Sequence, residues 1–332
     1  MTPTTFPRRA LLALALPALL IAAACGGGED AGDESVAAVI KGLDNPFFQT
    51  MRDGMTDQAD RSDIDVEIQA AQSITDTTGQ GERLSAVAQQ PFGCFVVNPI
   101  SGNNLIQGLA QVAAQDVPIV NIDQPIDDDA AQTADVSVDT YIGTDNVEAG
   151  ALAGEQMIEL VGEGKVAIIG GVAGDQTSND RIAGFTEAAE DTLDLLPVVA
   201  ADWNRQQALT TANDLMTAND DLAGIFTAND DMGLGAARAV ANAGKSDDVR
   251  VISLDGNEEA LQAVADGALD ATVAQYPYAI GQLGLQACEQ LMAGEEVPEE
   301  VAAPVALITP DNAETAIERF PEPVEDFDNP LD

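Results

Sequence analysis

The stretch VAAVIKGLDNPFF, residues 36–48, decides how this chain folds. Its first part, Val36–Ile40, is a short apolar run of the kind that forms a strand covered on both faces of a parallel sheet. Asn45 and Pro46 are typical of a turn or of a helix start, and Gln49–Asp60 has a helical pattern. The stretch therefore predicts a strand, a polar loop and a helix in that order.

The same unit recurs along the chain. Further apolar runs predict strands at Val66–Gln69, Phe95–Asn98, Pro118–Asp123, Lys165–Ile169, Gly224–Thr227, Arg250–Leu254 and Ala271–Ala274. Helical patterns cover Asn103–Gln115, Val147–Val161, Arg181–Asp191, Asp231–Ala243 and Pro277–Ala293. Strands separated by helices of this length form βαβ units and parallel sheets. These units are too many for one comfortable sheet, so we expect an α/β protein of two doubly wound, Rossmann-like lobes.

The N-terminal segment indicates where the chain works. Arg8 and Arg9 precede an uncharged apolar run, Ala10–Ala24, and Cys25 follows it. A positive region, a short apolar region and small residues before a cleavage point are typical of an export signal. A cysteine directly after them is typical of a lipoprotein.

We therefore expect residues 1–24 to be a signal peptide and acylated Cys25 to begin the mature chain, lipid-anchored at the outer face of the cytoplasmic membrane. Residues 25–34 are expected to be a flexible tether, because they lack periodicity and are rich in glycine and acidic side chains. A plain secretory peptide or an N-terminal anchor helix is the alternative, and either one also implies export.

The charge balance restricts the possible partners. The chain has 13 basic and 57 acidic residues. Cleavage before Cys25 would remove Arg8 and Arg9, so the mature chain would have 11 basic and 57 acidic residues and a formal charge of −46. Such a surface repels nucleic acid and anionic lipid headgroups, so neither is expected as a partner. Because the acidic residues are spread along the whole chain, a high-salt habitat is favoured over a cationic partner protein.

Two cysteines lie beyond the predicted lipidation site. Cys94 falls in a strand pattern and Cys288 in a helix pattern. Two buried free thiols are the favoured interpretation, because free cysteine behaves as a small apolar residue. A disulfide is the alternative outside the cytoplasm, and the sequence gives no distance that would establish it.

Polar side chains gather where the predicted strands end. In open α/β folds, ligands bind beyond the carboxyl ends of the strands. The groups at these ends are Asn45, Asp123, Gln124, Asn229, Asp255 and Gln275, with Arg181 opening a helix and the aromatic rings of Phe47, Phe48 and Trp203 nearby. Carboxylates, amides and a guanidinium hold hydroxyl groups in defined geometry, and rings cover the C–H faces of a sugar. Each residue alone has a plain structural explanation as a turn, cap or core residue, and only the combination predicts a site for a neutral polyhydroxylated ligand.

Motifs for catalysis are missing from the sequence. The chain has no histidine, the commonest general base and metal ligand. Gly244-Lys245-Ser246 lacks the first glycine and the preceding strand of a phosphate-binding loop. The run Asp127-Asp128-Asp129 fits no calcium-loop spacing. We therefore expect no enzyme, no cofactor and no metal site.

Taken together, the motifs of the strand ends resemble those of the type I periplasmic sugar-binding proteins of ABC importers, the family that includes ribose-binding protein. The resemblance extends over about residues 35–312. It rests on these motifs in this order: Asn45-Pro46-Phe47-Phe48, Val97-Asn98-Pro99, Asn121-Ile122-Asp123, Thr144-Asp145-Asn146, Asp180–Phe185, Thr227–Asp230, Leu254-Asp255-Gly256 and Ala274-Gln275.

The resemblance implies a fold of two lobes joined by three crossings, near Gly143–Asp145, Gln275–Tyr276 and Val305–Leu307. It implies an N-terminal lobe of residues 35–143 and 276–305, and a C-terminal lobe of residues 144–275 and 306–319. Residues 320–332, rich in proline and aspartate, are expected to be a loose tail. The lobes of this family close on a ligand like a hinged clamp.

The resemblance also implies the ligand residues and partners. From the N-terminal lobe these are Asn45, Phe47, Phe48, Asp123 and Gln124, and from the C-terminal lobe and hinge Arg181, Trp203, Asn229, Leu254, Asp255 and Gln275. The partners would be a small neutral sugar, an ABC permease and its ATPase, and the protein would act as a monomer. A sensor that presents a sugar, or a furanose-like signal, to a receptor kinase is the alternative.

Two positions depart from the ribose-binding pattern. Gln124 stands where ribose binders have an arginine, and Leu254 stands where they have an aromatic ring. Loss of a bidentate guanidinium and of one ring face changes the shape and polarity of the pocket. The sugar therefore stays open among ribose, another pentose, a hexose such as fructose, and a polyol.

Overall fold

A computed structural model of the chain describes residues 1–2 and 35–332. The chain divides into two units, residues 1–31 and residues 32–332, and the following account concerns residues 35–332. The predictions of a signal peptide, of a lipidated Cys25 and of a tether fall on residues 1–34 and lie outside this described part. No helix within it has the length and apolarity needed to cross a bilayer.

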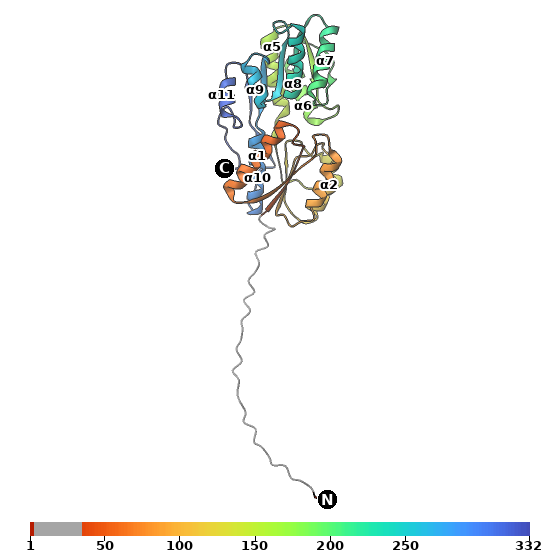
Figure 1. Cartoon of the computed structure of the whole chain (residues 1–332), viewed down its shortest axis with the longest axis vertical. Coiled ribbons are helices and arrows are strands. Elements are labelled where there is room, and N and C mark those ends of the chain that lie inside the picture. Colours follow the sequence, from red (N-terminus) through yellow and green to blue (C-terminus); the bar gives the residue numbers. More distant parts are fainter. Residues whose placement is uncertain (3–34) are drawn as a thin grey trace. The chain divides into compact units, whose positions relative to one another are not determined.

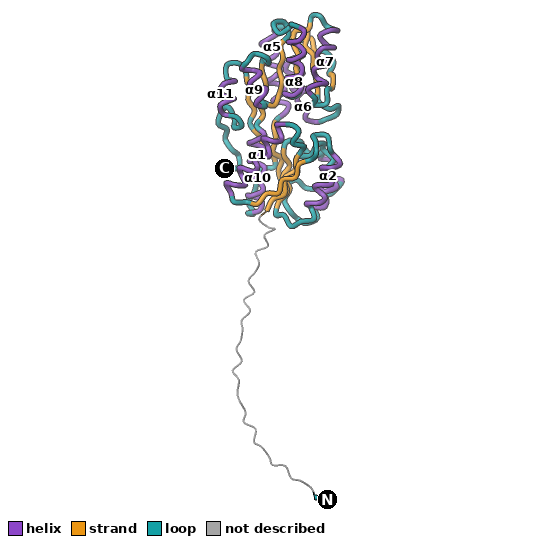
Figure 2. Tube along the Cα trace, viewed as in Figure 1, coloured by secondary structure: helices purple, strands orange, loops and turns teal. Residues whose placement is uncertain are grey.

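The first lobe is built on a six-stranded parallel sheet (Figures 1 and 2). Its strands, in the order in which they lie side by side, are β12 (Glu300–Ala303), β5 (Thr140–Thr144), β4 (Ile119–Ile122), β3 (Cys94–Val97), β1 (Ser35–Ile40) and β2 (Asp65–Ala70). Its helices are α1 (Pro46–Ser62), α2 (Thr77–Val87), α3 (Ile106–Ala113), α4 (Asp128–Thr133) and α10 (Pro277–Met292).

The second lobe is built on another, mostly parallel sheet. Its strands, in spatial order, are β13 (Val305–Ile308), β11 (Ala271–Gln275), β10 (Arg250–Asp255), β9 (Leu222–Thr227), β6 (Lys165–Gly170) and β7 (Asp194–Leu195), with β8 (Val199–Ala200) also paired to β6. Only β13 runs antiparallel to its neighbour. Its helices are α5 (Asn146–Val161), α6 (Gln176–Ala189), α7 (Arg205–Ala218), α8 (Asp230–Ala243), α9 (Glu258–Ala265) and α11 (Ala313–Arg319). The predicted α/β fold of two lobes is confirmed.

Apolar strands and helix caps explain why these elements form where they do. All six residues of β1 are buried, as expected for a strand covered on both faces. Helix α1 begins at Pro46, whose missing N–H costs nothing in a first turn. The Asn45 side chain caps this helix by accepting from the backbone N–H of Phe47 at 2.9 Å. The polar loop after the strand is therefore held in one conformation at the sheet edge.

The chain passes between the two sheets three times. It leaves the first sheet after Thr144, returns to it after Gln275, and leaves it again between β12 and β13. Pro304 separates these last two strands, so Val305 already pairs with Gln275 in the second sheet. The third crossing thus lies at Pro304, near the expected Val305–Leu307, and the pairing corrects the expectation that Val305 belongs to the N-terminal lobe.

Cys94 and Cys288 form a disulfide between β3 and α10. The interpretation of two free thiols is therefore wrong, although both residues are completely buried as it assumed. The two cysteines are 194 residues apart in the sequence, and only the return of the chain to the first lobe at α10 brings them together. The bridge itself lies within the first lobe, but the loop that it closes contains nearly all of the second lobe.

The C-terminal tail is packed, which corrects the expectation that residues 320–332 are loose. Leu331 is 4% exposed and joins the core of the first lobe, while Phe327 contacts the cores of both lobes. The Leu331 carbonyl accepts hydrogen bonds from the Gln286 and Gln290 amides of α10. Earlier in the tail, the backbone N–H of Val324 donates to the Tyr276 hydroxyl at the hinge, at 3.2 Å. The composition of the tail is polar, but its few apolar residues anchor it.

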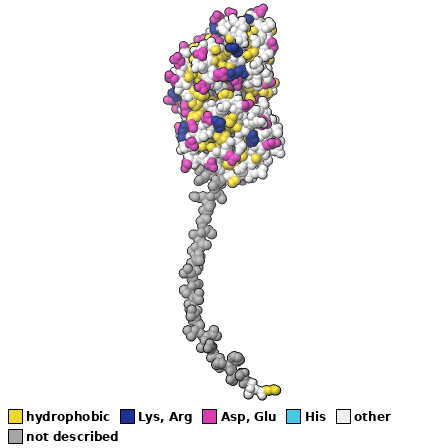
Figure 3. Space-filling model, viewed as in Figure 1, with side chains coloured by type: hydrophobic (Ala, Val, Ile, Leu, Met, Phe, Trp, Pro, Cys, Tyr) yellow, Lys and Arg dark blue, Asp and Glu magenta, His cyan; other side chains and the backbone are white. Residues whose placement is uncertain are grey.

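Acidic side chains are distributed over the visible face of both lobes, with few basic ones between them (Figure 3). This distribution agrees with the spread of acidic residues along the sequence.

Candidate ligand-binding site

A cavity lies between the two lobes, at the edge where the strands of each sheet end. It has a volume of about 70 Å³. One water needs about 10–15 Å³ measured in this way, so the cavity has room for one compact molecule. Its lining comprises Lys41, Asn45, Phe47, Phe48, Ile74, Ile100, Asp123 and Gln124 from the first lobe, and Asp175, Thr177, Arg181, Trp203, Asn229 and Asp255 from the second.

The first lobe supplies rings and an amide at the start of α1. Phe47 and Phe48 pack edge to face, with their ring centres 5.2 Å apart, and are 4% and 8% exposed. The Asn45 oxygen is used in capping the helix, which leaves its amide nitrogen as the group available to a ligand. This arrangement offers an apolar surface beside a hydrogen-bond donor, as a sugar ring requires.

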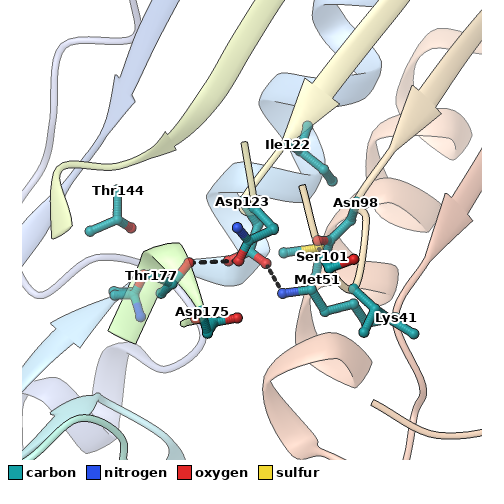
Figure 4. Close-up of polar contacts among 12 residues, drawn as sticks. Lys41, Met51, Asn98, Ser101, Ile122, Asp123, Thr144, Asp175 and Thr177 are labelled. Atoms are coloured by element: carbon teal, nitrogen blue, oxygen red, sulfur yellow. Dashed lines mark hydrogen bonds and ion pairs between the residues drawn. The ribbon is translucent and has the colours of Figure 1, made fainter. Parts of the chain in front are cut away.

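An ion pair lies beside these rings. The Lys41 ammonium is 3.1 Å from the Asp123 carboxylate, and their side chains are 13% and 9% exposed (Figure 4). The same ammonium lies 5.1 Å from the centre of the Phe48 ring. Lys41 follows β1 directly, yet the sequence analysis did not select it. Its place after an apolar strand, at the same edge as Asp123, was the signal that could have found it.

The second lobe holds Arg181 in a fixed orientation. Its Nε donates to the Asn146 side chain at 2.8 Å, and Nη1 donates to the Ala228 carbonyl at 2.7 Å and to Asp255 at 3.1 Å. The guanidinium lies 5.8 Å from the Trp203 ring. With three partners and only 4% exposure, this arginine is a rigid part of the wall.

Gly171 provides the space that Trp203 occupies. A Cβ at position 171 would collide with the indole ring. The loop after β6 therefore needs glycine there for the ring to reach the cavity.

Asp255 is the most perturbed acid of the site. Burial raises its pKa to about 8, although the neighbouring Arg181 guanidinium and a hydrogen bond from Gln275 act in the opposite direction. Burial also raises the pKa of Asp230, which accepts hydrogen bonds from Ser253, Thr272 and the backbone N–H of Asn257. Asp230 supports the loop that carries Asp255 and does not line the cavity.

Unusual backbone conformations gather at this cavity. Asp123, Trp203 and Asp255 have φ values of 60°, 59° and 143°, in the region that residues other than glycine avoid. Such strained residues are often found at binding sites, where the surrounding structure holds them. Here the Tyr141 hydroxyl donates to the Asp123 carbonyl at 2.7 Å and helps to fix that conformation.

The structure brings most of the predicted site residues together. Nine of the eleven line the cavity: Asn45, Phe47, Phe48, Asp123, Gln124, Arg181, Trp203, Asn229 and Asp255. Leu254 does not, because its side chain packs in the core of the second lobe, and neighbouring strand residues point to opposite faces. Gln275 does not either. Its amide donates to Asp255 at 2.8 Å from behind the wall.

Five further residues line the cavity that the sequence did not predict there: Lys41, Ile74, Ile100, Asp175 and Thr177. Asp175 and Thr177 lie at the start of α6, one turn before the predicted helix at Arg181. Ile74 and Ile100 lie in loops, where no periodic pattern marks an apolar residue.

The chemistry of this wall suits a small neutral molecule with several hydroxyl groups. The cavity is lined by acceptors on Asp123 and Asp255, by donors on Asn45, Arg181 and Asn229, and by three aromatic rings. Within residues 35–332, no three acidic or cysteine side chains are arranged to hold a metal ion.

Known proteins are similar to this chain over most of the part that the structure describes. A model of the periplasmic binding protein domain matches residues 36–296. The D-allose-binding periplasmic protein of Escherichia coli (strain K12) is 36% identical over 75% of this chain and 82% of its own length. The ribose import binding protein RbsB of Bacillus subtilis (strain 168) is 31% identical over 83% of this chain and 87% of its own.

Solved structures are similar over the same region. An ABC transporter periplasmic solute binding protein from Actinobacillus succinogenes 130z with bound D-allose has a TM-score of 0.80 and 27% identity, covering 85% of this chain and 99% of the other. A carbohydrate transporter solute binding protein from Agrobacterium radiobacter in complex with D-arabinose has a TM-score of 0.76 and 28% identity, covering 86% and 98%.

Proposed function

This chain belongs to the periplasmic binding protein family, and on that premise we propose that it is the sugar-binding protein of an ABC importer. It captures one monosaccharide between its two lobes and delivers it to the permease. Members of the family bind substrates and catalyse no reaction, and the proposed mechanism forms no covalent bond.

The observation that carries the proposal is the composition of the cavity wall. Charged and amide side chains from both lobes meet aromatic rings around a space for one compact molecule. A sugar bound there would bridge Asn45 and Asp123 on one side and Arg181, Asn229 and Asp255 on the other. Because the ligand would bond to both lobes at once, binding would favour the closed arrangement of the hinge.

We place hexoses first among the sugars, and D-allose first among hexoses. A relative at 36% identity is a D-allose-binding protein, and a structural neighbour holds D-allose. Gln124 lines the cavity where ribose binders have an arginine, so the wall differs from a ribose site at this position. D-ribose, fructose and xylitol remain the comparison ligands, and a xylitol-binding protein is also a relative.

We further propose that the protein is exported, lipid-anchored through Cys25 and monomeric. The sequence of residues 8–25, with its arginine pair, apolar run and cysteine, supports export and lipid anchoring. Substitution Cys25→Ala would release the protein from the membrane fraction, and an unchanged membrane fraction would contradict the anchor.

Isothermal titration calorimetry of residues 26–332 in high salt tests the sugar-binding function. We expect D-allose or another sugar of the panel to bind with micromolar or tighter affinity. Asp123→Ala should weaken that binding at least tenfold, since hydrogen bonds to charged groups contribute about 1.5–3 kcal/mol. Asp221→Ala, at a surface ion pair with Lys165, is the matched control and should leave it unchanged. Folded protein that binds none of the sugars would overturn the proposal.

An uptake assay distinguishes a role in sugar transport from a role as a sugar sensor. Deletion of the gene should abolish uptake of the bound sugar if the protein serves an importer. Normal uptake with loss of a sugar-dependent transcriptional response would favour the sensor.

A further inference from the structure

One side-chain hydrogen bond joins the two lobes directly at the cavity. The Thr177 hydroxyl of α6 donates to the Gln124 amide oxygen of the first lobe at 2.8 Å. Both residues line the cavity, and they are 8% and 2% exposed. Within residues 35–319, the other side-chain hydrogen bond between the lobes lies at the hinge itself, where the Asn146 amide donates to the Thr144 carbonyl two residues away.

Gln124 is held firmly on its own lobe. Its backbone carbonyl accepts from the Asn121 amide at 2.9 Å, and the Asn121 oxygen accepts from the backbone N–H of Ile126 at 2.9 Å. Asn121 thus closes the loop after β4 on both sides of Gln124. The position of the glutamine relative to its sheet is fixed.

Thr177 is held with equal firmness on the other lobe. It lies in the first turn of α6, which Asp175 caps by accepting from the backbone N–H of Ser178 at 2.9 Å. The Ser178 hydroxyl in turn accepts from the backbone N–H of Gly171 at 2.9 Å, which ties the helix start to the loop after β6. Because both partners have rigid supports, their bond depends on how the lobes are placed and breaks when the lobes separate.

The bond also decides which end of the Gln124 amide a ligand meets. An amide has one acceptor oxygen and one donor nitrogen. Thr177 uses the oxygen, so the nitrogen is the group that Gln124 presents to a molecule in the cavity. Gln124 then differs from Asp123 beside it, which presents only acceptors when ionised.

We infer that Thr177 is a positioning residue for sugar binding: it fastens the closed lobes through Gln124 and orients the Gln124 amide as a donor toward the sugar. This inference rests on the proposed function and deepens it. It assigns to Thr177 a role in affinity that requires no contact between Thr177 and the sugar. The same hydrogen bond then contributes both to the closure of the lobes and to the recognition of the sugar.

The test compares three substitutions on α6. Thr177→Val keeps the shape and removes the hydroxyl, Thr177→Ser keeps the hydroxyl, and Thr186→Val makes the same change on the same helix outside the cavity. A net hydrogen bond contributes about 0.5–1.5 kcal/mol, so Thr177→Val should weaken sugar binding by about 2- to 12-fold. Thr177→Ser and Thr186→Val should bind as the wild type does.

Trp203, the single tryptophan of the chain, lines the cavity and gives a fluorescence signal for stopped-flow measurements. Because the bond forms when the lobes close, Thr177→Val should raise the dissociation rate more than it lowers the association rate. A merely structural role for Thr177 would lower the melting temperature without this change in rates. If Thr177→Val does not fold, Thr177→Ala replaces it.

A double-mutant cycle isolates the pair. In a Gln124→Met background, Thr177→Val should cost no further affinity, because the partner that the hydroxyl acts through is absent. The inference would be overturned if Thr177→Val bound the sugar as tightly as the wild type does. It would also be overturned if Thr177→Ser lost as much affinity as Thr177→Val, or if Thr177→Val cost as much affinity in the Gln124→Met background as in the wild type. A wild-type protein that binds no sugar would instead overturn the proposed function.

Discussion

Lys41 and Asp123 form a nearly buried ion pair of 3.1 Å between the ends of β1 and β4, on the wall of the cavity. Lys41 supplies a positive charge on the first-lobe side of the wall, whereas the other lining cation, Arg181, lies on the second lobe. Lys41→Met would leave Asp123 without its cation and remove a donor to the ligand. We expect sugar affinity to fall at least tenfold, since hydrogen bonds to charged groups contribute about 1.5–3 kcal/mol, as measured by calorimetry.

Lys165→Met is the matched control for this prediction. Lys165 also pairs with an aspartate, Asp221 at 2.9 Å, but that carboxylate is 73% exposed. Surface pairs of this kind contribute about 0–1 kcal/mol to stability, and neither residue of this pair lines the cavity. Equal affinities of Lys41→Met and Lys165→Met would contradict a role for Lys41 in binding.

The raised pKa of Asp255 predicts that the free energy of unfolding depends on pH. Burial raises its pKa in the folded protein to about 8, from an ordinary value of 3.8. The folded state therefore holds this proton more tightly than the unfolded state does. The contribution of Asp255 to stability is full below about pH 4 and is lost as the pH rises to about 8.

Asp255→Asn, which cannot ionise, isolates this effect. In urea titrations at constant salt, the unfolding free energy of the wild type should fall relative to that of Asp255→Asn as the pH rises from 5 to 8. All other acidic residues are common to both proteins and cancel. A difference that does not vary with pH would show that the burial of Asp255 does not shift its titration.

The disulfide between Cys94 and Cys288 should stabilise the first lobe, because it closes a long loop in the unfolded chain. Loss of a native disulfide commonly costs about 2–5 kcal/mol. Reduction with dithiothreitol under mildly denaturing conditions should therefore lower the melting temperature of the wild type. The double variant Cys94→Ala/Cys288→Ala should already melt lower and should not respond to dithiothreitol. Mass spectrometry that finds two free thiols in air-oxidised protein would refute the bridge.

The packed C-terminal tail predicts a cost for truncating Leu331. Leu331 is 4% exposed against the core of the first lobe. Leu331→Ala should lower the unfolding free energy by about 2 kcal/mol, the low end for buried leucines, because a chain end relaxes easily. Val198→Ala, at a side chain that is 48% exposed, should change it by less than about 0.5 kcal/mol. Equal effects of the two substitutions in urea titrations would mean that the tail is not docked in solution.

Much of the fold and of the site followed from local patterns in the sequence. Apolar runs such as Val36–Ile40 predicted strands because both faces of a parallel sheet are covered. The polar residues after those runs, such as Asp123 and Asn229, then had to meet at one edge of each sheet. Binding of ligands at that edge is a property of the fold class, and the cavity lies there.

What the sequence could not provide depends on contacts between distant segments. The Cys94–Cys288 bridge and the contact between Thr177 and Gln124 join segments that meet only after the chain has crossed between lobes. The docking of Leu331 depends on the Gln286 and Gln290 amides of α10, which no local pattern connects to the tail.

Leu254 was predicted at the site for a different reason. The prediction came from resemblance, whereas the alternation of side chains along β10 turns Leu254 away from the face of Asp255. A check of that alternation would have removed Leu254 from the predicted site.

The crystal structure of residues 26–332 grown with D-allose tests the central claim most directly. We expect density for one sugar in the cavity between the lobes. That sugar should be hydrogen-bonded to Asn45 and Asp123 on one side and to Arg181, Asn229 and Asp255 on the other, with Phe48 and Trp203 against its faces. A sugar bound elsewhere, or one that contacts a single lobe, would contradict it.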